Sequence, residues 1–276
     1  MPSDLHIHSN LSDGTDTPEA LVDMAKAAGL TTISITDHDG VDAIEPAIKR
    51  GAEIGVEVIP GIEFTCEIPR AEVHILGYFI DYKSNDLLSV LKKIQDDRVA
   101  RIYKICEKLN KLGVKLDPDD VFKISGKKVP GRPHVARALI AKGYVSGFKE
   151  AFNRYLDFRG PAFVGHYKLS PAEAVKLIAG VSGIPVFAHP AISNCDEIIP
   201  ALTADGLRGL EAFYPGYDDQ RIKHYKTLAK KFGLLITGGS DFHGNDAGRE
   251  AKLGDVTLPD EYMEKLKDEH LRRNQP

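Results

Sequence analysis

Residues 3–36, SDLHIHSNLSDGTDTPEALVDMAKAAGLTTISIT, predict a strand, a helix and a second strand. The two strands, Ser3–His8 and Thr31–Thr36, are short runs in which leucine and isoleucine are followed by polar residues. The helix between them begins after Thr17, a favoured N-cap with proline at the next position, and Gly29 ends it. A strand, a helix and a strand in this order favour an α/β fold.

Five further runs rich in Val, Ile, Leu and Phe predict strands. They are Val56–Ile62, Glu72–Tyr78, Ile184–Ala188, Leu207–Phe213 and Leu234–Thr237. Another helix is predicted after Ser170, which has capping-box spacing to Glu173, and one more over residues 219–231, which Gly233 follows. Seven strands that alternate with helices predict a parallel α/β sheet or barrel.

The alternation stops between Tyr78 and Ile184, where strand signals are weak. Helical patterns there cover residues 86–112, 132–141 and 148–155. We therefore expect residues 81–167 to form a helical insertion that grips the substrate. Residues 1–80 and 168–276 are expected to form the core that carries the catalytic site.

The composition is that of an ordinary globular protein. The chain has 276 residues, is 42% hydrophobic and 28% charged, and carries a formal charge of −4. This excludes disordered and disulfide-scaffold classes, and the mild acidity excludes a protein that coats duplex DNA by charge. We expect no membrane span, because no apolar run reaches about 18 residues. Three widely spaced cysteines and a polar start without a signal-peptide pattern predict a cytoplasmic protein.

Histidine and acidic residues concentrate at the ends of the predicted strands. His6 and His8 lie two residues apart and therefore share one face of a strand, which suits a single metal ion. Asp241 and His243 repeat this spacing after the last strand. Five further candidates lie in or after the other strands; they are Asp13, His38, Glu63, His74 and His189.

Each of these features alone has an ordinary explanation. A His-x-His pair occurs by chance in many proteins, Asp13 beside Gly14 fits a simple turn, and His74 in an apolar run fits a core histidine. The combination favours a site, because the strand ends of a parallel barrel meet at one face. Since buried charges without partners are costly, we expect metal ions to hold these six histidines and three carboxylates together.

The same residues resemble the motifs of the polymerase and histidinol phosphatase (PHP) superfamily of metal-dependent phosphoesterases. The motifs stand here as Asp4-Leu5-His6-Ile7-His8 with Ser12-Asp13-Gly14, Thr36-Asp37-His38, His189-Pro190 and Ser240-Asp241-Phe242-His243. Glu63 and His74 occupy the two intervening ligand positions. The resemblance covers residues 1–80 and 180–250, and it implies a distorted (β/α)7 barrel with a trinuclear metal centre.

The resemblance also implies how the ligands divide among three divalent ions. The first ion would be held by His6, His8, Glu63 and Asp241, and the second by Asp13, His38 and His243. The third would be held by His74, His189 and a bridging Glu63. Nitrogen and oxygen ligands without thiolates suit Mn²⁺, Fe²⁺ or Zn²⁺. Glu63, Asp241 and His189 are the expected catalytic residues, around a hydroxide that bridges the ions and attacks phosphorus.

A segment within the predicted insertion resembles one particular branch of the PHP superfamily. Residues 131–137, Gly-Arg-Pro-His-Val-Ala-Arg, are similar to the branch of nucleoside 3′,5′-bisphosphate phosphatases and 5′-3′ exoribonucleases. This implies substrates that are bisphosphate nucleotides, AMP-like nucleotides or the 5′ ends of short RNA. The expected substrate-binding residues are Arg98, Arg101, Arg132 and His134. For Arg98 and Arg101, which lie on one helix face, a solvated surface is the alternative.

Two other functions remain open. A histidinol-phosphate phosphatase would need a pocket for a small amine, which no feature of the insertion favours. A non-catalytic metal-bound PHP module, like those attached to polymerases, would be expected to lack some ligands, whereas all nine are present here. Neither duplex DNA nor a membrane is expected as a partner, and the sequence makes no prediction of the oligomeric state.

Overall fold

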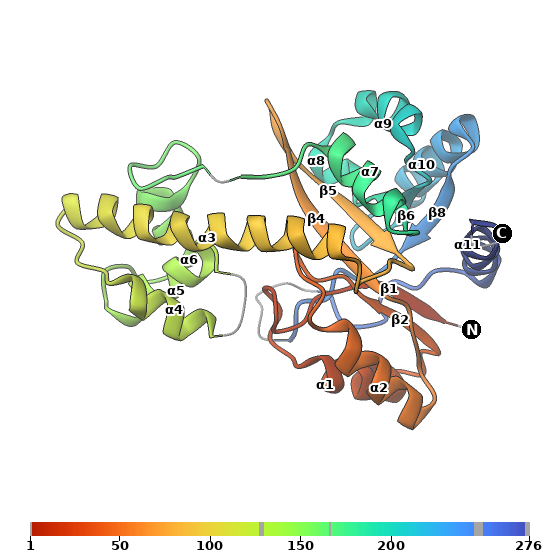
Figure 1. Ribbon diagram of the computed structural model, residues 1–276, viewed down its shortest axis with the longest axis horizontal. Helices are drawn as coiled ribbons and strands as arrows, with labels where there is room; N and C mark the ends of the chain where they lie inside the picture. Colours follow the sequence, from red (N-terminus) through yellow and green to blue (C-terminus); the bar gives the residue numbers. More distant parts are fainter. Residues whose placement is uncertain (1, 127–129, 166, 246–250, 274–276) are drawn as a thin grey trace. The chain divides into compact units, whose positions relative to one another are not determined.

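The computed structural model describes residues 2–126, 130–165, 167–245 and 251–273. The chain forms two compact units, and most of their helices and strands are labelled in Figure 1. Unit 1 consists of residues 1–89 and 168–276, and unit 2 of residues 90–167. The sequence predicts an insertion that begins at residue 81, whereas unit 2 begins at Val90, inside helix α3 (Asn85–Lys111).

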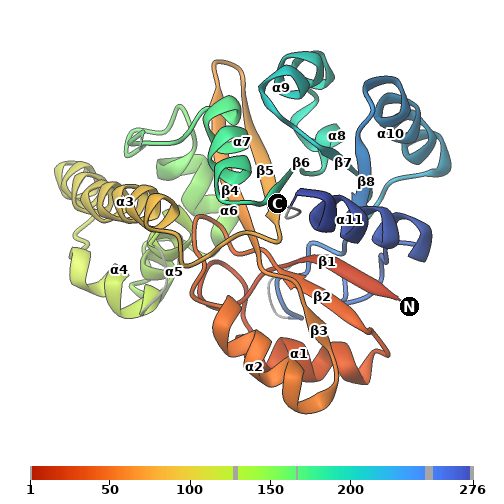
Figure 2. The ribbon, with the colours of Figure 1, turned by 45° about the vertical axis from the view of Figure 1, so that its right-hand side comes forward.

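Unit 1 contains a first sheet of three parallel strands in the order β1, β2, β3. These are β1 (Ser3–Ile7), β2 (Thr32–Ile35) and β3 (Glu57–Val58). Helices α1 (Pro18–Ala27) and α2 (Ile44–Ile54) connect them and pack apolar side chains against the sheet, on the same side in Figures 1 and 2. The predicted N-cap is confirmed, since the Thr17 hydroxyl accepts a hydrogen bond from the Ala20 amide at 3.2 Å.

A second sheet in unit 1 has five strands in the order β4 to β8. These are β4 (Gly61–Ile68), β5 (Ala71–Tyr78), β6 (Ile184–Phe187), β7 (Gly209–Phe213) and β8 (Leu235–Gly238). The last three strands are parallel, but β5 is antiparallel to both β4 and β6. The expectation of an all-parallel arrangement is therefore wrong here. The tight turn between Ile68 and Ala71 forces β4 and β5 into a hairpin.

The predicted strand Val56–Ile62 is divided between the two sheets. β3 ends at Val58, and β4 begins at Gly61. Pro60 lies between them and has no amide hydrogen, so it cannot continue a hydrogen-bonded ladder. Gly61 is required at the start of β4, because a Cβ atom there would lie 2.2 Å from the Ser34 hydroxyl oxygen.

Single backbone bridges connect the two sheets. Ile7 of β1 pairs with Phe242 after β8, and His38 after β2 pairs with Glu63 of β4. These bridges bring the ends of β1, β2, β4 and β8 together. The α/β architecture is thus confirmed, but among the described residues the pairing gives two sheets linked at points, and the closed seven-stranded barrel is not confirmed.

The remaining helices of unit 1 follow the strands of the second sheet along the chain, and the last of them forms the C-terminal segment. They are α7 (Pro171–Gly180), α8 (Pro190–Ser193), α9 (Ile199–Asp205), α10 (Asp219–Phe232) and α11 (Asp260–Arg273). The predicted capping box is confirmed, because Ser170 and Glu173 bond to each other's backbone amides. No described helix combines the length and apolar character needed to cross a bilayer.

Unit 2 is helical (Figure 2). It contains the greater part of α3, then α4 (Pro118–Ser125), α5 (Arg132–Ala141), α6 (Phe148–Ala151) and a π-helical turn over Phe152–Leu156. The helix predicted over residues 132–141 is confirmed as α5. Helix α4 was not predicted, although Asp117 before Pro118 is an N-cap signal. Unit 2 has its own apolar core, which includes Ile102, Leu109 and Val135.

Candidate metal centre

Strand β1 positions the first two predicted ligands. The side chains of His6 and His8 are fully buried and share one face of the strand. The His6 Nε2 atom lies 3.3 Å from Glu63 Oε2 and 3.4 Å from Asp241 Oδ1. The His8 Nε2 atom lies 3.2 Å from each of the same two oxygens. Two carboxylates therefore lie between two imidazoles.

Glu63, on β4, is the centre of the cluster. Besides the two β1 histidines, its carboxylate contacts His74 Nδ1 at 2.9 Å, His38 Nδ1 at 3.2 Å and His189 Nε2 at 3.2 Å. Burial would raise the pKa of this carboxyl, but the surrounding imidazoles, His38 first, hold it well below its usual range. The Glu63 carboxylate is consequently ionised, and it lies at the centre of the cluster.

Asp13 joins the cluster from the loop after β1. Its carboxylate lies 3.2 Å from His243 Nε2, 3.6 Å from His8 Nδ1 and 3.9 Å from His38 Nε2. The rings of His8 and His243 are stacked with their centroids 4.1 Å apart. The structure thus brings together all nine residues that the sequence suggests as ligands.

The possible ligand atoms fall into four overlapping groups, each with its atoms within 4.8 Å of one another. The groups are His8, Asp13, His38 and His243; His6, His189 and Asp241; His6, His8 and Glu63; and His38, Glu63 and His74. This grouping places His189 with Asp241, whereas the resemblance to the PHP superfamily pairs His189 with His74. Because several residues belong to two groups, the geometry suits ions that share ligands.

Buried polar atoms in the cluster show that metal ions fit it. Six nitrogen and oxygen atoms, several of them close to one another, make no hydrogen bond of suitable geometry with any described residue; they are His6 Nε2, His8 Nδ1, His8 Nε2, Glu63 Oε2, His189 Nδ1 and His243 Nε2. Each such buried atom costs free energy unless something satisfies it. Divalent cations accept electron pairs from these donor types, so the donor set suits Mn²⁺, Fe²⁺ or Zn²⁺.

Comparison with known proteins agrees with this geometry. The model of the PHP domain matches residues 4–162, more than half of the chain. The chain belongs to the PHP domain family. A 3′,5′-nucleoside bisphosphate phosphatase of Chromobacterium violaceum is 30% identical to it over 267 residues, 93% of this chain and 94% of the relative.

Two further comparisons cover nearly the whole PHP protein. A 5′-3′ exoribonuclease of Haemophilus influenzae is 31% identical over 265 residues, which are 93% of this chain and 96% of the relative. A solved structure described as a metal-dependent phosphoesterase, from Bifidobacterium adolescentis, superposes with a TM-score of 0.86 at 30% identity. That superposition covers 99% of this chain and 96% of the solved one.

A carboxylate that was not predicted from the sequence contacts two of the candidate ligands. Glu211 is fully buried on β7. Its Oε1 atom lies 2.9 Å from His6 Nδ1, and its Oε2 atom accepts a hydrogen bond from the His189 backbone amide at 2.7 Å. A carboxylate on Nδ1 keeps the proton on that nitrogen and leaves Nε2 facing Glu63 and Asp241. The available signal was an acidic residue in the apolar run Gly209–Phe213.

Two buried aspartates fix the loops that carry ligands. Asp37 accepts hydrogen bonds from the Ser9 amide at 2.7 Å and the Ser12 hydroxyl at 2.6 Å, and so shapes the loop before Asp13. Asp4 accepts the amide of Ser240 at 2.9 Å, next to Asp241. Burial raises the pKa of the Asp4 carboxyl to about 6, although the hydrogen bonds that Asp4 accepts, those from Ser240 first, lower this pKa. Both aspartates belong to the PHP motifs and position the candidate ligands beside them.

Two candidate ligands have backbone conformations that L-residues rarely adopt. The φ angles of His189 and Asp241 are 25° and 49°. Such residues cost about 1–3 kcal/mol each and persist where neighbours hold them. Here Glu211 bonds the His189 amide, and the Tyr214 hydroxyl donates to Asp241 Oδ2 at 2.8 Å.

The four predicted substrate residues belong to unit 2. Arg101 is only 4% exposed, and its Nε donates to the Val164 carbonyl at 2.7 Å. His134 is buried, and its Nδ1 atom accepts a hydrogen bond from the Gly131 amide at 3.2 Å, within the turn that begins α5. Arg98 lies next to the same glycine, and half-buried Arg132 donates to the Leu156 carbonyl. Arg98, Arg132 and His134 therefore cluster around one turn.

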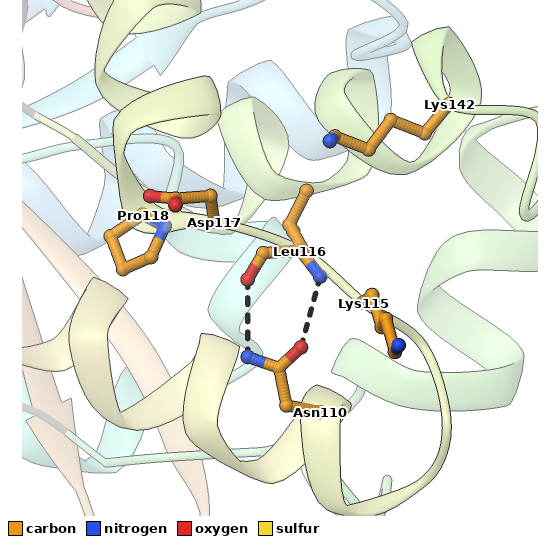
Figure 3. A pocket seen from close by; sticks show the side chains of 6 residues that line it. All are labelled: Asn110, Lys115, Leu116, Asp117, Pro118 and Lys142. Carbon is orange, nitrogen blue, oxygen red and sulfur yellow. Dashed lines mark hydrogen bonds between the residues drawn. The ribbon is translucent and has the colours of Figure 1, made fainter.

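A hollow of about 470 Å³ in unit 2 contains none of the predicted residues. Figure 3 shows its lining, which consists of Asn110, Lys115, Leu116, Asp117, Pro118 and Lys142. The Asn110 amide is occupied in two hydrogen bonds to the Leu116 backbone. Lys142 is 2.7 Å from Asp120. These groups hold the segment between α3 and α4 in place.

Proposed function

We propose that this chain is a metal-dependent phosphoesterase that hydrolyses phosphate monoesters or diesters of nucleotides. The proposed substrates are nucleoside 3′,5′-bisphosphates, AMP-like nucleotides and the 5′ ends of short RNA. The observation that carries the proposal is the convergence of six imidazoles and three carboxylates around Glu63. The functions of the two relatives, a bisphosphate phosphatase and an exoribonuclease, support the nucleotide substrate class.

The proposed centre holds three divalent ions, which are Mn²⁺, Fe²⁺ or Zn²⁺. The four ligand groups overlap at His6, His8, His38 and Glu63, which supports several ions with shared ligands. We also propose that the two sheets of unit 1 form a distorted (β/α)7 barrel. The bridges from Ile7 to Phe242 and from His38 to Glu63 support this arrangement.

The residues of the chain prepare the site for phosphoryl chemistry. Divalent ions bound here would lower the pKa of water and stabilise charge on phosphoryl oxygens. Glu63 and Asp241 remain ionised, because neighbouring histidines hold the pKa of both carboxyls well below the usual range against the effect of burial. Glu211 orients His6. The proposal assigns Glu63, Asp241 and His189 to the catalytic group and uses no protein nucleophile.

The turn at Gly131 is the proposed source of substrate binding. Arginine binds phosphate through two parallel hydrogen bonds, which suits recognition of a second phosphate group. Arg98 and Arg132 are proposed to make these contacts. The buried pair Arg101 and His134 hold the surrounding backbone, through Val164 and Gly131 respectively.

Metal analysis of the purified protein, together with a phosphate-release panel, tests this function. The panel contains a nucleoside 3′,5′-bisphosphate, AMP, a short 5′-phosphorylated RNA and histidinol phosphate. We expect bound divalent ions and hydrolysis of the nucleotides, but not of histidinol phosphate. Failure on every phosphoester after reconstitution with Mn²⁺ would favour the non-catalytic module. Preference for histidinol phosphate would favour the alternative phosphatase.

A further inference from the structure

Unit 2 differs in charge from the rest of the chain. Residues 90–167 contain 17 Lys and Arg but only 8 Asp and Glu, a formal charge of +9. Because the whole chain carries −4, the remaining residues carry −13. A basic segment in an acidic protein is typical of contact with a polyanion.

An aromatic pair, in which one ring is exposed and the other partly buried, lies within this basic unit. The side chain of Phe158 is 68% exposed, and its ring packs edge-to-face on Phe163 with the centroids 5.1 Å apart. The Arg132 guanidinium lies 5.6 Å from the centroid of the Phe163 ring. A single exposed apolar side chain is ordinary. An aromatic pair beside a guanidinium, however, offers both a stacking face and a positive charge.

Cations that have no ion-pair partner among the described residues lie beside the aromatic pair, while four acids of unit 2 are paired with other cations. The ion pairs are Lys92 with Asp96, Lys111 with Glu107, Lys142 with Asp120 and Arg154 with Glu150. Lys104, Lys108 and Arg159 form no ion pair with any residue that the structure describes. Lys108 donates a hydrogen bond to the Phe163 carbonyl at 2.6 Å. Lys104 lies one helical turn before Lys108 on α3, and Arg159 directly follows Phe158 in the sequence.

We propose that these six residues, Phe158, Phe163, Lys104, Lys108, Arg132 and Arg159, form a binding surface for single-stranded RNA, called here the Phe158 surface. Phe158 stacks on a nucleobase, and the lysines and arginines contact phosphates. Aromatic stacking is tolerant of base identity and needs bases that are not enclosed in a duplex. This proposal rests on the proposed function, because the phosphoester hydrolysis itself is assigned to the metal centre of unit 1. It assigns to unit 2 the preference for oligonucleotides over mononucleotides.

Binding of a fluorescent RNA to the full, metal-loaded chain tests the surface. The probe is a phosphorothioate RNA of about twelve nucleotides, long enough for one such surface and resistant to hydrolysis. We expect Phe158→Ala to weaken binding about tenfold, the effect of removing one stacked base, and Phe158→Tyr to bind like the native chain. The matched control is Tyr103→Ala, which removes another exposed ring of unit 2, 53% exposed and packed on Phe122.

Charge variants provide an independent measurement. Lys104→Glu with Arg159→Glu is expected to weaken binding and to reduce its salt dependence, by about 0.7 in the logarithmic slope for each phosphate that the variant no longer neutralises. Lys111→Glu is the control, because Lys111 is already paired with Glu107. Native-like binding by Phe158→Ala, or equally weakened binding by the controls, would overturn the proposal. Equal competition by duplex RNA or by a polyglutamate peptide would overturn it as well.

Hydrolysis by the same variants separates this inference from the proposed function. We expect Phe158→Ala to raise KM for short RNA and to leave KM for a nucleoside 3′,5′-bisphosphate unchanged. If no phosphoester is hydrolysed but Phe158→Ala still weakens RNA binding, the proposed function is wrong and the Phe158 surface stands. If hydrolysis is normal and RNA binding is unaffected by the variants, the surface alone is wrong.

Discussion

The metal centre of unit 1 and the Phe158 surface of unit 2 are built in opposite ways. At the centre, Glu63, His6, His8, His189 and His243 are buried, and Glu211 bonds the His6 ring and the His189 backbone amide. At the surface, Phe158 and the cations around it are mostly exposed, and few protein groups hold them. Buried charges are tolerated only where ions or partners compensate them, whereas exposed ones are tolerated anywhere. A substitution in the centre should therefore affect metal and activity together, and one at the surface should affect substrate preference alone.

The largest effect is expected from removing a ligand. Asp241→Ala or His8→Ala should release at least one ion per chain and abolish turnover, while unit 1 stays folded, because each residue belongs to the overlapping ligand groups. Elemental analysis, phosphate release and circular dichroism measure these three quantities. Asp205→Ala is the control, since Asp205 is a surface acid paired with Lys176. Unaltered metal content and activity would refute the assignment.

A smaller effect is expected from Glu211→Gln. The amide keeps the shape but has only one acceptor oxygen, so it cannot serve both His6 and the His189 amide as the carboxylate does. We expect metal affinity to fall about 10- to 100-fold, measured by competition with a chelator. Glu72→Gln is the comparison, because Glu72 lies 3.4 Å from His74 Nε2 but is exposed to solvent. An equal fall in both variants would show that Glu211 has no special positioning role.

The effect of Arg132→Ala should depend on the substrate. We expect kcat/KM for a nucleoside 3′,5′-bisphosphate to fall about tenfold, the effect of removing one charge-assisted hydrogen bond, and kcat/KM for an aryl phosphate to change little. Steady-state kinetics on both substrates measure the difference. Arg154→Ala is the control, because Arg154 is paired with Glu150. An equal fall on the aryl phosphate would contradict a role in binding a second phosphate.

The last prediction concerns the reactivity of a cysteine in the core of unit 2, which should affect neither metal binding nor activity. Burial, with a further contribution from Asp117 and Asp120, raises the pKa of the Cys106 thiol to about 12. The reactive thiolate is therefore scarce at pH 8, and alkylation by iodoacetamide should be slow until urea unfolds the unit. Mass spectrometry of the labelled peptide follows the reaction. Labelling in the native state as fast as in urea would show that this core is not closed.

The clustering of the nine candidate ligands could be predicted because their pattern has a physical cause. His6 and His8 share a strand face, and imidazoles and carboxylates at several strand ends imply a common partner. Two features of the fold could not be predicted in the same way. The break at Pro60 and the hairpin of β4 and β5 depend on which sheet each segment joins, which short apolar runs do not encode.

The supporting residues were harder to predict than the ligands. Glu211 looks like any single acid in a strand, and only its contacts with His6 and the His189 amide show what it does. Phe158 is still less conspicuous, because an exposed phenylalanine has no spacing or periodicity that marks it. Roles that depend on three-dimensional neighbours therefore require the structure.

The pairing of Ile7 with Phe242 has a consequence for how the protein is made. His6 and His8 are synthesised more than 200 residues before Asp241 and His243, although the two segments pair with each other. Nascent chains can fold partly during translation, but contacts this distant in sequence form late. The four groups of possible ligands can thus be completed only after Asp241 and His243 have been synthesised, and a chain interrupted before Asp241 would lack residues from two of these groups.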